Sequence, residues 1–495
     1  MTSKSAETRP FAMTTFDKIH TALRTSAMVA LALIPLTSHG TPLTGVSGAN
    51  AAFDNTQDTL ALNRMVATTG VFPRGSGGSG TDLPLGAIRT AAFNFLPGGA
   101  ADVNGDLLSI ASNPTLFALM GTTYGGDGTT TFGLPNLEDT LALGRGTGPG
   151  LSPWAVGQRR GSNDTVLAQN QMPAHSHALA GGATTGNTGG SSPLDNLQSS
   201  LGTFYAINTG GTFPSSGSSS DHGFFGEVNL FAAANTSRLP GGWLPAEGQI
   251  LSIASNTALF AVIGTTYGGD GTNTFALPDL RGRTAIGVGA RPGDTAVVLG
   301  QRLGNETVTL TQNELASHTH GLPGGADTGA SGGGLAFSNL QPSLGMNFLI
   351  STTGIFPSPG SGAFDPTTPF LGEVVMFAGN PNNIPFNWLP AEGQILSIAS
   401  NTALFTLLGT NYGGDGQTTF ALPDLRGRSV VDESATRPIG SVAGHDSVTL
   451  TVANLPAHTH TLPVAASVDE PSTLILLLLT GALWPLTGVR TRIRS

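Results

Sequence analysis

The sequence predicts a β-rich α+β protein with three tandem modules, each built of short strands around one short helix and joined by Gly/Ser-rich linkers. Three observations support this fold class: a long unit occurs three times, apolar residues come in short runs between glycine turns, and Gly plus Pro make up about a fifth of the 495 residues. Only 11% of the residues are charged, against roughly 25% in ordinary soluble domains, which disfavours long helices and coiled coils. The hydrophobic share of 39% is enough to build cores and disfavours a charge-rich disordered chain.

One unit is repeated three times along the chain. The segment Tyr124–Gly128 (YGGDG) recurs at Tyr267–Gly271 and Tyr412–Gly416, at offsets of 143 and 145 residues. The stretch Trp243–Phe260 is identical to Trp388–Phe405. Such a period is too long for a solenoid repeat and suits whole domains. We therefore predict units at 54–178, 196–321 and 339–461, with Gly/Ser/Thr-rich flexible joints or exposed loops at 180–192, 210–220, 321–334 and 357–363.

The strands are predicted from short apolar runs in the second unit. Residues 226–231 have a strand-like pattern with a counterpart at 372–377, and 249–254 is a second candidate strand. The segment 267–271 then makes a tight turn, because its glycines readily adopt positive φ. It contains no Lys and one Asp, so turn geometry explains it better than a phosphate or calcium loop. Residues 274–280 return as extended chain.

One short helix is predicted in each unit, between the second strand and the glycine turn. In the second unit Ser255 or Asn256 can cap it, and Gly264 ends it. Its buried face is predicted to consist of Leu259, Val262 and Ile263.

These residues carry a resemblance to a known family. The run from Gly226-Glu-Val through the YGGDG turn to Arg281-Gly-Arg283 looks like the phage tail collar domain, and the likeness covers 85–142, 226–283 and 372–428. The wider unit, which ends in Ser317-His-Thr-His320, resembles the microcystin-dependent protein family built on that domain. The resemblance implies binding rather than catalytic turnover.

The first unit departs from the family pattern and is a degenerate copy. The Trp of the other units is missing around 97–101, and Glu138-Asp-Thr140 replaces Arg-Gly-Arg. A role carried by those arginines therefore does not transfer to the first unit. In the other two units, we expect the arginines of each Arg-Gly-Arg to form ion pairs with Asp279 or Asp424 and to hold the loop in place.

Six of the ten histidines occur as three His-x-His pairs near the ends of the units: His175, His177, His318, His320, His458 and His460. If each segment is extended, the two imidazoles of a pair point to one side and can share a divalent transition metal. In the phage short tail fibres that the collar domain resembles, three chains each offer such a pair to one metal on a threefold axis. The resemblance thus implies one pseudo-threefold site within this chain. The alternative is a repeated pair without metal that is hydrogen-bonded to the backbone.

The N-terminus has the order of a secretory signal peptide, which we assign to residues 1–40. Lys18 and Arg24 precede an apolar run at 27–34, and a small-x-small triplet follows at 38–40. A second candidate cleavage site lies at 49–51. The alternatives are an ordinary buried N-terminal helix and a start of translation at Met13.

Residues 468–495 combine Glu470-Pro471, an apolar span at 474–489 and a closing cluster of arginines. This order resembles the PEP-CTERM sorting signal, although Asp469 replaces the usual proline. The resemblance implies an exosortase-type processing system as a partner and anchoring in the inner membrane, transient or permanent, through 474–489. A plain tail anchor is the alternative.

The composition narrows the function. Residues 41–471 contain 14 Arg and 29 acidic residues, a formal charge of −15, so we expect no nucleic-acid partner. The chain lacks Cys and shows no recognisable catalytic motif, and we expect no enzymatic activity. Our hypothesis is an exported cell-surface or extracellular-matrix structural and binding protein, with surface polysaccharide as a partner. The alternatives are a phage or tailocin tail-fibre receptor-binding protein and a secreted polysaccharide-active enzyme.

Overall fold

The three predicted units appear in the structure as three copies of one order of elements. The structure, a computed structural model, describes residues 41–73, 84–214, 222–292, 295–358 and 368–463. The predicted signal peptide and sorting signal lie outside these residues, as do 215–220 and 359–363 of the predicted joints. None of the helices in the described part of the chain is both long and apolar enough to span a bilayer.

Each unit begins with a long strand, followed by two shorter ones. The long strands are β2 (Thr59–Ala67), β11 (Ser200–Asn208) and β20 (Ser343–Ser351). The second strands are β3 (Ala87–Ala91), β12 (Glu227–Phe231) and β21 (Glu373–Phe377). The third strands are β4 (Ala100–Asp102), β13 (Trp243–Pro245) and β22 (Trp388–Pro390). The predicted strands at 226–231 and 372–377 are thus confirmed.

A hairpin that encloses the helix comes next. The hairpins are β5 (Leu107–Ser109) with β6 (Thr131–Gly133), β14 (Ile250–Ser252) with β15 (Thr274–Ala276), and β23 (Ile395–Ser397) with β24 (Thr419–Ala421). The helices are α1 (Pro114–Met120), α2 (Thr257–Ile263) and α3 (Thr402–Leu408). The last strands are β7 (Leu141–Gly144), β16 (Thr284–Gly287) and β25 (Ser429–Asp432), followed by the short β8 (Arg159–Arg160), β17 (Arg302–Leu303) and β26 (Val442–Ala443).

The helix prediction is confirmed in α2 except for its cap. Leu259, Val262 and Ile263 are buried, and the helix ends at Gly264. Asn256 occupies the N-cap position, but its side chain makes no capping bond and donates to the carbonyl of Ser252 instead. The stability of this seven-residue helix therefore comes from its buried face, as expected for a helix too short to be stable alone.

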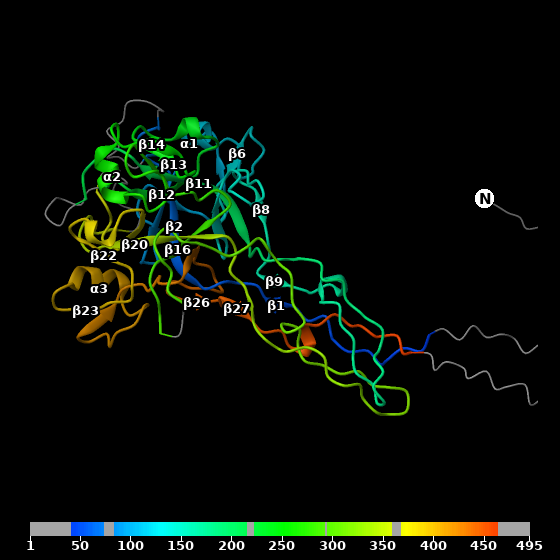
Figure 1. The fold of residues 1–495 in the computed structure, drawn as a ribbon. Coiled ribbons are helices and arrows are strands. Elements are labelled where there is room, and N and C mark those ends of the chain that lie inside the picture. Colours follow the sequence, from blue (N-terminus) through cyan, green and yellow to red (C-terminus); the bar gives the residue numbers. More distant parts are fainter. Residues whose placement is uncertain (1–40, 74–83, 215–221, 293–294, 359–367, 464–495) are drawn as a thin grey trace, which may run out of the picture. The chain divides into compact units, whose positions relative to one another are not determined.

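The three units exchange their last strands. β7 of the first unit pairs in parallel with β11 of the second unit, and β16 pairs in the same way with β20 of the third. β25 of the third unit returns to β2 of the first. Each unit is thus completed by its predecessor, and the chain closes into a cycle with pseudo-threefold symmetry. The long strands β2, β11 and β20 and the strand β16 are labelled in Figure 1.

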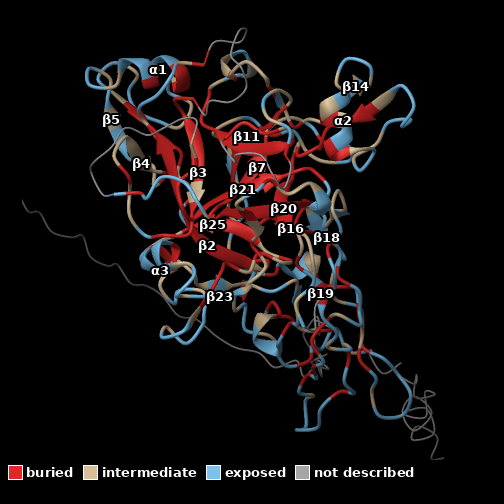
Figure 2. Cartoon of the chain, turned by 90° about the vertical axis from the view of Figure 1, so that its left-hand side faces the viewer, coloured by how far each residue is buried: buried red, intermediate tan, exposed pale blue. Residues whose placement is uncertain are grey.

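The second strands complete the cycle at its centre. The start of β12 pairs with the end of β21, the start of β21 with the end of β3, and the start of β3 with the end of β12. The residues of these strands and of the long strands are almost all buried (Figure 2). One hydrophobic core draws residues from all three units. Three modules hanging separately on linkers are therefore not what the described residues form.

Two of the stretches predicted as flexible joints or exposed loops are largely exposed, but they form hydrogen-bonded turns rather than flexible joints. In 180–192, Thr188 pairs with His175 and Thr184 with Ala178; in 321–334, Ser331 pairs with His318. Both stretches return along their own His-x-His segment, so their glycines serve tight turns rather than flexibility.

The first unit shows how its departures from the pattern are accommodated. Ala100 of β4 takes the strand position that Trp243 and Trp388 occupy in the other units. Asp139 replaces the glycine of Arg-Gly-Arg. Its φ is positive, 46°, as are those of Gly282 and Gly427, 65° and 64°.

A second, smaller core lies next to the histidines. The short pairs β1 (Phe53–Asp54) with β9 (Asp164–Thr165), β10 (Leu194–Asp195) with β18 (Thr307–Val308), and β19 (Phe337–Ser338) with β27 (Ser447–Val448) lie outside the large sheet. They surround a separate cluster that includes Met172, Leu315 and Leu455. Each of these three residues stands three positions before the first histidine of a pair.

Three buried glutamines give direct evidence of the pseudo-threefold symmetry. The backbone N–H of Gln57 donates to Oε1 of Gln198, that of Gln198 to Gln341, and that of Gln341 back to Gln57, at 2.9, 3.0 and 3.1 Å. Each unit thereby supplies one donor and one acceptor, which locks the three chain segments together.

Candidate metal centre

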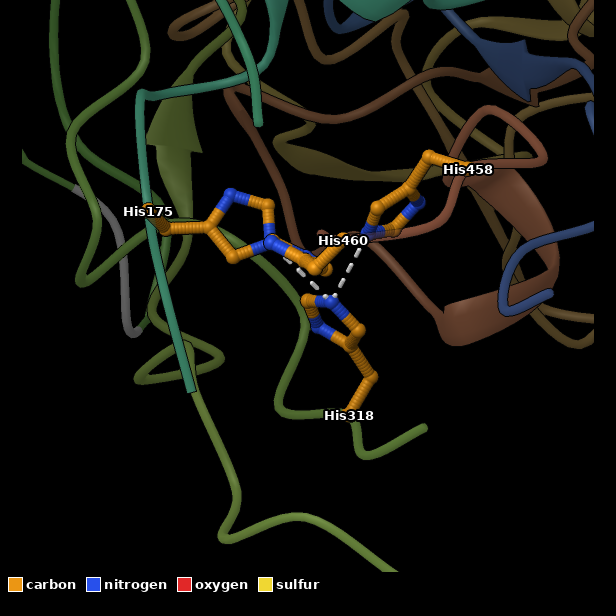
Figure 3. A group of neighbouring side chains, drawn as sticks. All are labelled: His175, His318, His458 and His460. Atoms are coloured by element: carbon orange, nitrogen blue, oxygen red, sulfur yellow. Dashed lines mark hydrogen bonds between the residues drawn. The ribbon is translucent and has the colours of Figure 1, made fainter. Parts of the chain in front are cut away.

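The structure brings the six predicted histidines together. Nε2 of His318 lies 3.2 Å from Nε2 of His175 and 3.1 Å from Nε2 of His458, and these rings point toward one another (Figure 3). The second histidines of the pairs form a further layer, and Nε2 of His320 lies 3.2 Å from that of His458. All six residues are at most 4% exposed. Two stacked triangles of imidazoles, one residue from each unit in each triangle, thus share one buried centre.

The hydrogen bonds of the other ring nitrogens fix the tautomers. In the first triangle each Nδ1 lies 2.8–2.9 Å from the carbonyl two residues earlier in its own chain segment. In the second triangle each Nδ1 lies 2.8 Å from a carbonyl of another unit or of the N-terminal segment: Gly329 for His177, Gly45 for His320 and Gly186 for His460. A carbonyl only accepts, so each Nδ1 donates its proton when the ring is neutral. Each Nε2 then carries a lone pair that faces the centre.

Burial favours the neutral form of five of these rings. It lowers the pKa of His318 to about 3 and those of His458 and His460 to about 4, and it also lowers the pKa values of His175 and His320. Neighbouring imidazoles act in the same direction. Neutral rings cannot hydrogen-bond one another through two lone pairs, and Nε2 of His177 and of His460 have no hydrogen-bond partner among the described residues.

Three of the nitrogen–nitrogen distances match the edges of an octahedral metal shell. Neighbouring ligands of an octahedron are √2 times farther apart than metal and ligand. Edges of 3.1–3.2 Å therefore correspond to metal–nitrogen distances of about 2.2 Å, close to the roughly 2.1 Å of zinc–imidazole bonds. Two overlapping groups of four histidines have all their ligand atoms within 4.8 Å. An all-imidazole shell favours a divalent transition metal over calcium or magnesium.

The backbone hydrogen bonds of the alternative interpretation are present, and they leave each Nε2 available to a metal. The pairs are hydrogen-bonded to the backbone, but only through Nδ1. They do not lie in regular strands; the first histidine of each pair makes an isolated bridge, to Thr188, Ser331 or Ser47. The two rings of a pair nevertheless share one side, with centroids 5.3–5.4 Å apart.

Sequence reasoning missed the residues that hold the second histidines. Oγ1 of Thr185, Thr328 and Thr44 accepts the backbone N–H of His177, His320 and His460, at 3.0, 3.0 and 2.9 Å. The signal was present as a repeated motif, Thr-Gly-x-Ser/Thr-Gly, which begins at residues 44, 185 and 328. All three copies lie outside the predicted units, one before the first unit and two between units.

The predicted ion pairs of the arginine loops are also present. Nε of Arg281 lies 2.8 Å from Oδ1 of Asp279, and Nε of Arg426 lies 2.9 Å from Oδ1 of Asp424. The second arginines, Arg283 and Arg428, donate to backbone carbonyls of the same loops, of Arg281 and Asp424 respectively.

These loops lie at three equivalent contacts between units, which we call seams. At each seam the last strand of one unit forms a bridge with the loop of the next. Gly144 bridges to Arg281, Gly287 to Arg426, and Asp432 of the third unit to Glu138 of the first. In the first two seams the arginine packs against a glycine, Gly146 or Gly289, two residues beyond the bridge.

The third seam, where the cycle closes, has a different chemistry. Ser434 stands where the other seams have that glycine, and its hydroxyl donates to Oδ2 of Asp139 at 2.7 Å. A cavity of about 620 Å³ opens beside it. Its lining includes Asn136, Glu138, Asp139, Arg159, Arg160 and Asn163.

Comparison with known proteins supports the collar resemblance. Residues 86–142, 226–285 and 372–430 match the family model of the phage tail collar domain. Each match runs from the glycine before a second strand into a last strand. Neither the curated proteins nor the solved structures gave a match. The six histidines all lie outside the matched regions, so the candidate metal centre is not part of the family match.

Proposed function

We propose that the chain is an exported structural and binding protein, a single-chain counterpart of a three-chain tail fibre, cross-linked by one divalent transition metal. The observation that supports this most strongly is the convergence of six buried imidazoles from three units that each contain a collar match. Tail fibres are structural proteins, and the collar matches favour a structural role here. The cycle of exchanged strands gives one chain the arrangement that a trimer would otherwise supply.

The metal centre is tested by metal content. We expect about one divalent transition metal per chain in protein purified without chelator, and a lower melting temperature after the metal is removed. Metal that binds only the folded state stabilises it by about 2.7 kcal/mol at a hundredfold excess over the dissociation constant.

The controls separate the centre from other histidines. His318→Ala/His320→Ala should bind less than a tenth of a metal per chain, whereas His445→Gln, outside the cluster, should bind as the native protein does. A native chain without metal, with a melting temperature indifferent to chelator, would leave the histidines with a structural role only.

The proposal that the protein is exported to the cell surface or matrix rests on the two predicted terminal signals. The proposed route is removal of residues 1–40, followed by anchoring through 474–489 and handling by an exosortase-type system. A phage or tailocin tail-fibre protein remains the rival, since it shares the collar domain but is assembled in the cytoplasm. Detection of the protein in isolated envelopes or medium of the producing cells, and not in released phage-like particles, distinguishes the two.

The third-seam cavity is the proposed site for surface polysaccharide. Its lining balances two carboxylates with two guanidiniums and adds amides and hydroxyls, which suits a neutral polyhydroxylated ligand better than a strongly charged one. Arg159 reaches across it, with its guanidinium 3.0 Å from the carbonyl of Asn136 and 3.3 Å from Oγ1 of Thr140.

The second unit offers a matched control for this site. Arg159→Ala should weaken binding of oligosaccharides from the cells' own polysaccharide at least tenfold, measured by calorimetry. Arg302→Ala, at the equivalent position beside Asp279, should leave binding unchanged. Equal effects of both variants would place the ligand elsewhere. Release of new reducing ends by the native protein would instead support the rival hypothesis of a polysaccharide-active enzyme.

A further inference from the structure

We infer that residues 42–50 are the closing strand of the third unit, so that export processing has to cut before Pro42 if the metal centre is to be complete. The part of the inference that concerns processing and metal rests on the proposed function. The part that concerns closure rests on contacts alone.

In the first two units the chain supplies its own closing strand. After His175-x-His177 the chain turns and comes back, and Thr188 pairs with His175. After His318-x-His320 it does the same, and Ser331 pairs with His318. Both returning segments carry the Thr-Gly-x-Ser/Thr-Gly motif.

In the third unit the partner comes from the other end of the described chain. Ser47 pairs with His458, and Leu43 pairs with Thr461. The backbone N–H of His458 donates to the carbonyl of Ser47 at 2.9 Å, and that of Ser47 donates to the carbonyl of His458 at 3.0 Å. Residues more than 400 positions away thus replace a local hairpin.

Besides pairing with His458, this segment is hydrogen-bonded to two further histidines of the candidate metal centre. Oγ1 of Thr44 accepts the backbone N–H of His460 at 2.9 Å, over a separation of 416 residues. The carbonyl of Gly45 accepts from Nδ1 of His320 at 2.8 Å. The second contact orients an imidazole of the second unit, so the segment joins two units as well as closing one.

Residues 42–50 pack closely against the backbone just before His458. Gly48 has φ of 90°, and a Cβ there would lie 2.3 Å from the carbonyl oxygen of Pro456. Gly189 and Gly332 occupy the same position in the other units, where a Cβ would lie 2.3 Å and 2.5 Å from the carbonyls of Pro173 and Ala316. Three equivalent glycines at three equivalent close approaches show that residues 42–50 are a built part of the repeat.

Cleavage at the two candidate sites would have different consequences for residues 42–50. A cut after residue 40 leaves Pro42, whose carbonyl accepts from Leu462 at 2.7 Å, and the whole closing strand. A cut at 49–51 removes Thr44, Gly45 and Ser47 together. His320 and His460 would then lose their partners.

Closure is tested by amide hydrogen exchange in the full chain, which needs no metal. Thr44→Val removes the acceptor for His460, and we expect the amide of His460 to exchange at least tenfold faster. Val46→Leu is the matched control, because Val46 is 68% exposed and lies between Gly45 and Ser47, which both make contacts. This variant should leave the exchange of the His460 amide unchanged. Thr185→Val, the equivalent change within a local hairpin, should accelerate exchange at His177 similarly. Unchanged exchange at His460 in Thr44→Val would overturn the inference.

Processing is tested by the N-terminal residue of protein from the producing cells. A first residue of Thr41 or Pro42 is expected, and a first residue beyond Pro42 would overturn the inference. Zinc affinity separates this result from the metal proposal: Thr44→Val should bind zinc at least tenfold more weakly than Val46→Leu. If the native chain binds no metal, the metal proposal fails, while the exchange measurement still decides whether residues 42–50 close the cycle.

Discussion

At the scale of single residues, the candidate metal centre depends on two effects on each imidazole. Burial disfavours the charged ring, and a carbonyl at Nδ1 fixes the tautomer that points a lone pair at the centre. Without metal, the lone pairs of the six rings face one another with no proton between them. The histidines therefore cost stability in the metal-free protein, and the proposed metal would offset that cost.

This balance predicts a pH dependence of the metal-free protein. The ordinary histidine pKa is about 6.5, and the folded values for His318, His458 and His460 are about 3, 4 and 4. Between these limits the unfolded chain binds more protons than the folded chain. Stability present above pH 6.5 should therefore be lost as the pH falls toward 4.

Urea unfolding of chelator-treated protein at pH 8, 6 and 5 measures this loss. His318→Gln/His320→Gln, with one of the three pairs removed, should show a shallower decline between pH 6.5 and 4. A native protein with the same unfolding free energy at all three pH values would contradict the neutral, buried state of the rings.

At the scale of elements, the exchanged strands pass close beneath the loops of the next unit. A Cβ added at Gly287, the last residue of β16, would lie 1.9 Å from the carbonyl oxygen of Leu425. Gly144, at the end of β7, meets Leu280 in the same way at 2.1 Å. The third unit has Asp432 at this position, and the hydrogen bond across its seam is longer: 3.4 Å from Asp139 to Asp432, against 2.7 and 2.9 Å at the other two seams.

Gly287→Ala should therefore destabilise the protein by about 3 kcal/mol, because the backbone of the neighbouring unit has to move. Gly321→Ala is the control: it has no positive φ, and the nearest atom to its Cβ would be 4.0 Å away. We expect a change within about 0.5 kcal/mol there. Equal effects in guanidinium unfolding would show that the strand crossing is not the cause.

The second strands break the symmetry by a buried charge network. Glu373 of β21 pairs with Arg89 of β3 and lies 3.0 Å from Nε2 of His222. Nδ1 of the same ring lies 3.2 Å from Oε1 of Glu227 of β12. Burial opposes ionisation of Glu373, but the Arg89 and His222 charges outweigh it and lower its pKa to about 2. β12 and β21 thus each contribute a carboxylate, and β3 contributes the guanidinium.

At the scale of the whole molecule, strand exchange makes the units dependent on one another. The core is shared, and each long strand is completed by the last strand of the preceding unit. No unit can unfold without exposing an edge and part of the core of its neighbour.

We therefore expect one cooperative unfolding transition rather than three. Hydrogen exchange of amides in β2, β11 and β20, followed through increasing denaturant, should give coinciding midpoints for globally protected sites. Separate midpoints for the three strands would indicate independent modules.

The sequence by itself determined the local features of this protein. It predicted the threefold repeat, the helix over Leu259, Val262 and Ile263 with its end at Gly264, the glycine turn, the Asp279–Arg281 pair and the six histidines of the candidate centre. Each of these depends on residues a few positions apart or on a motif that recurs, and both kinds of signal can be read along the chain.

Only the tertiary structure decided how the units combine. A last strand such as β16 has the same local sequence whether it returns to its own unit or passes to the next, so strand exchange leaves no local pattern. The closing strand at residues 42–50, the seam cavity and the opposed Nε2 atoms likewise depend on segments that meet only after the cycle closes. Hydrogen bonds over a separation of 416 residues are decided by which pairing buries the shared core, and that is a property of the whole fold.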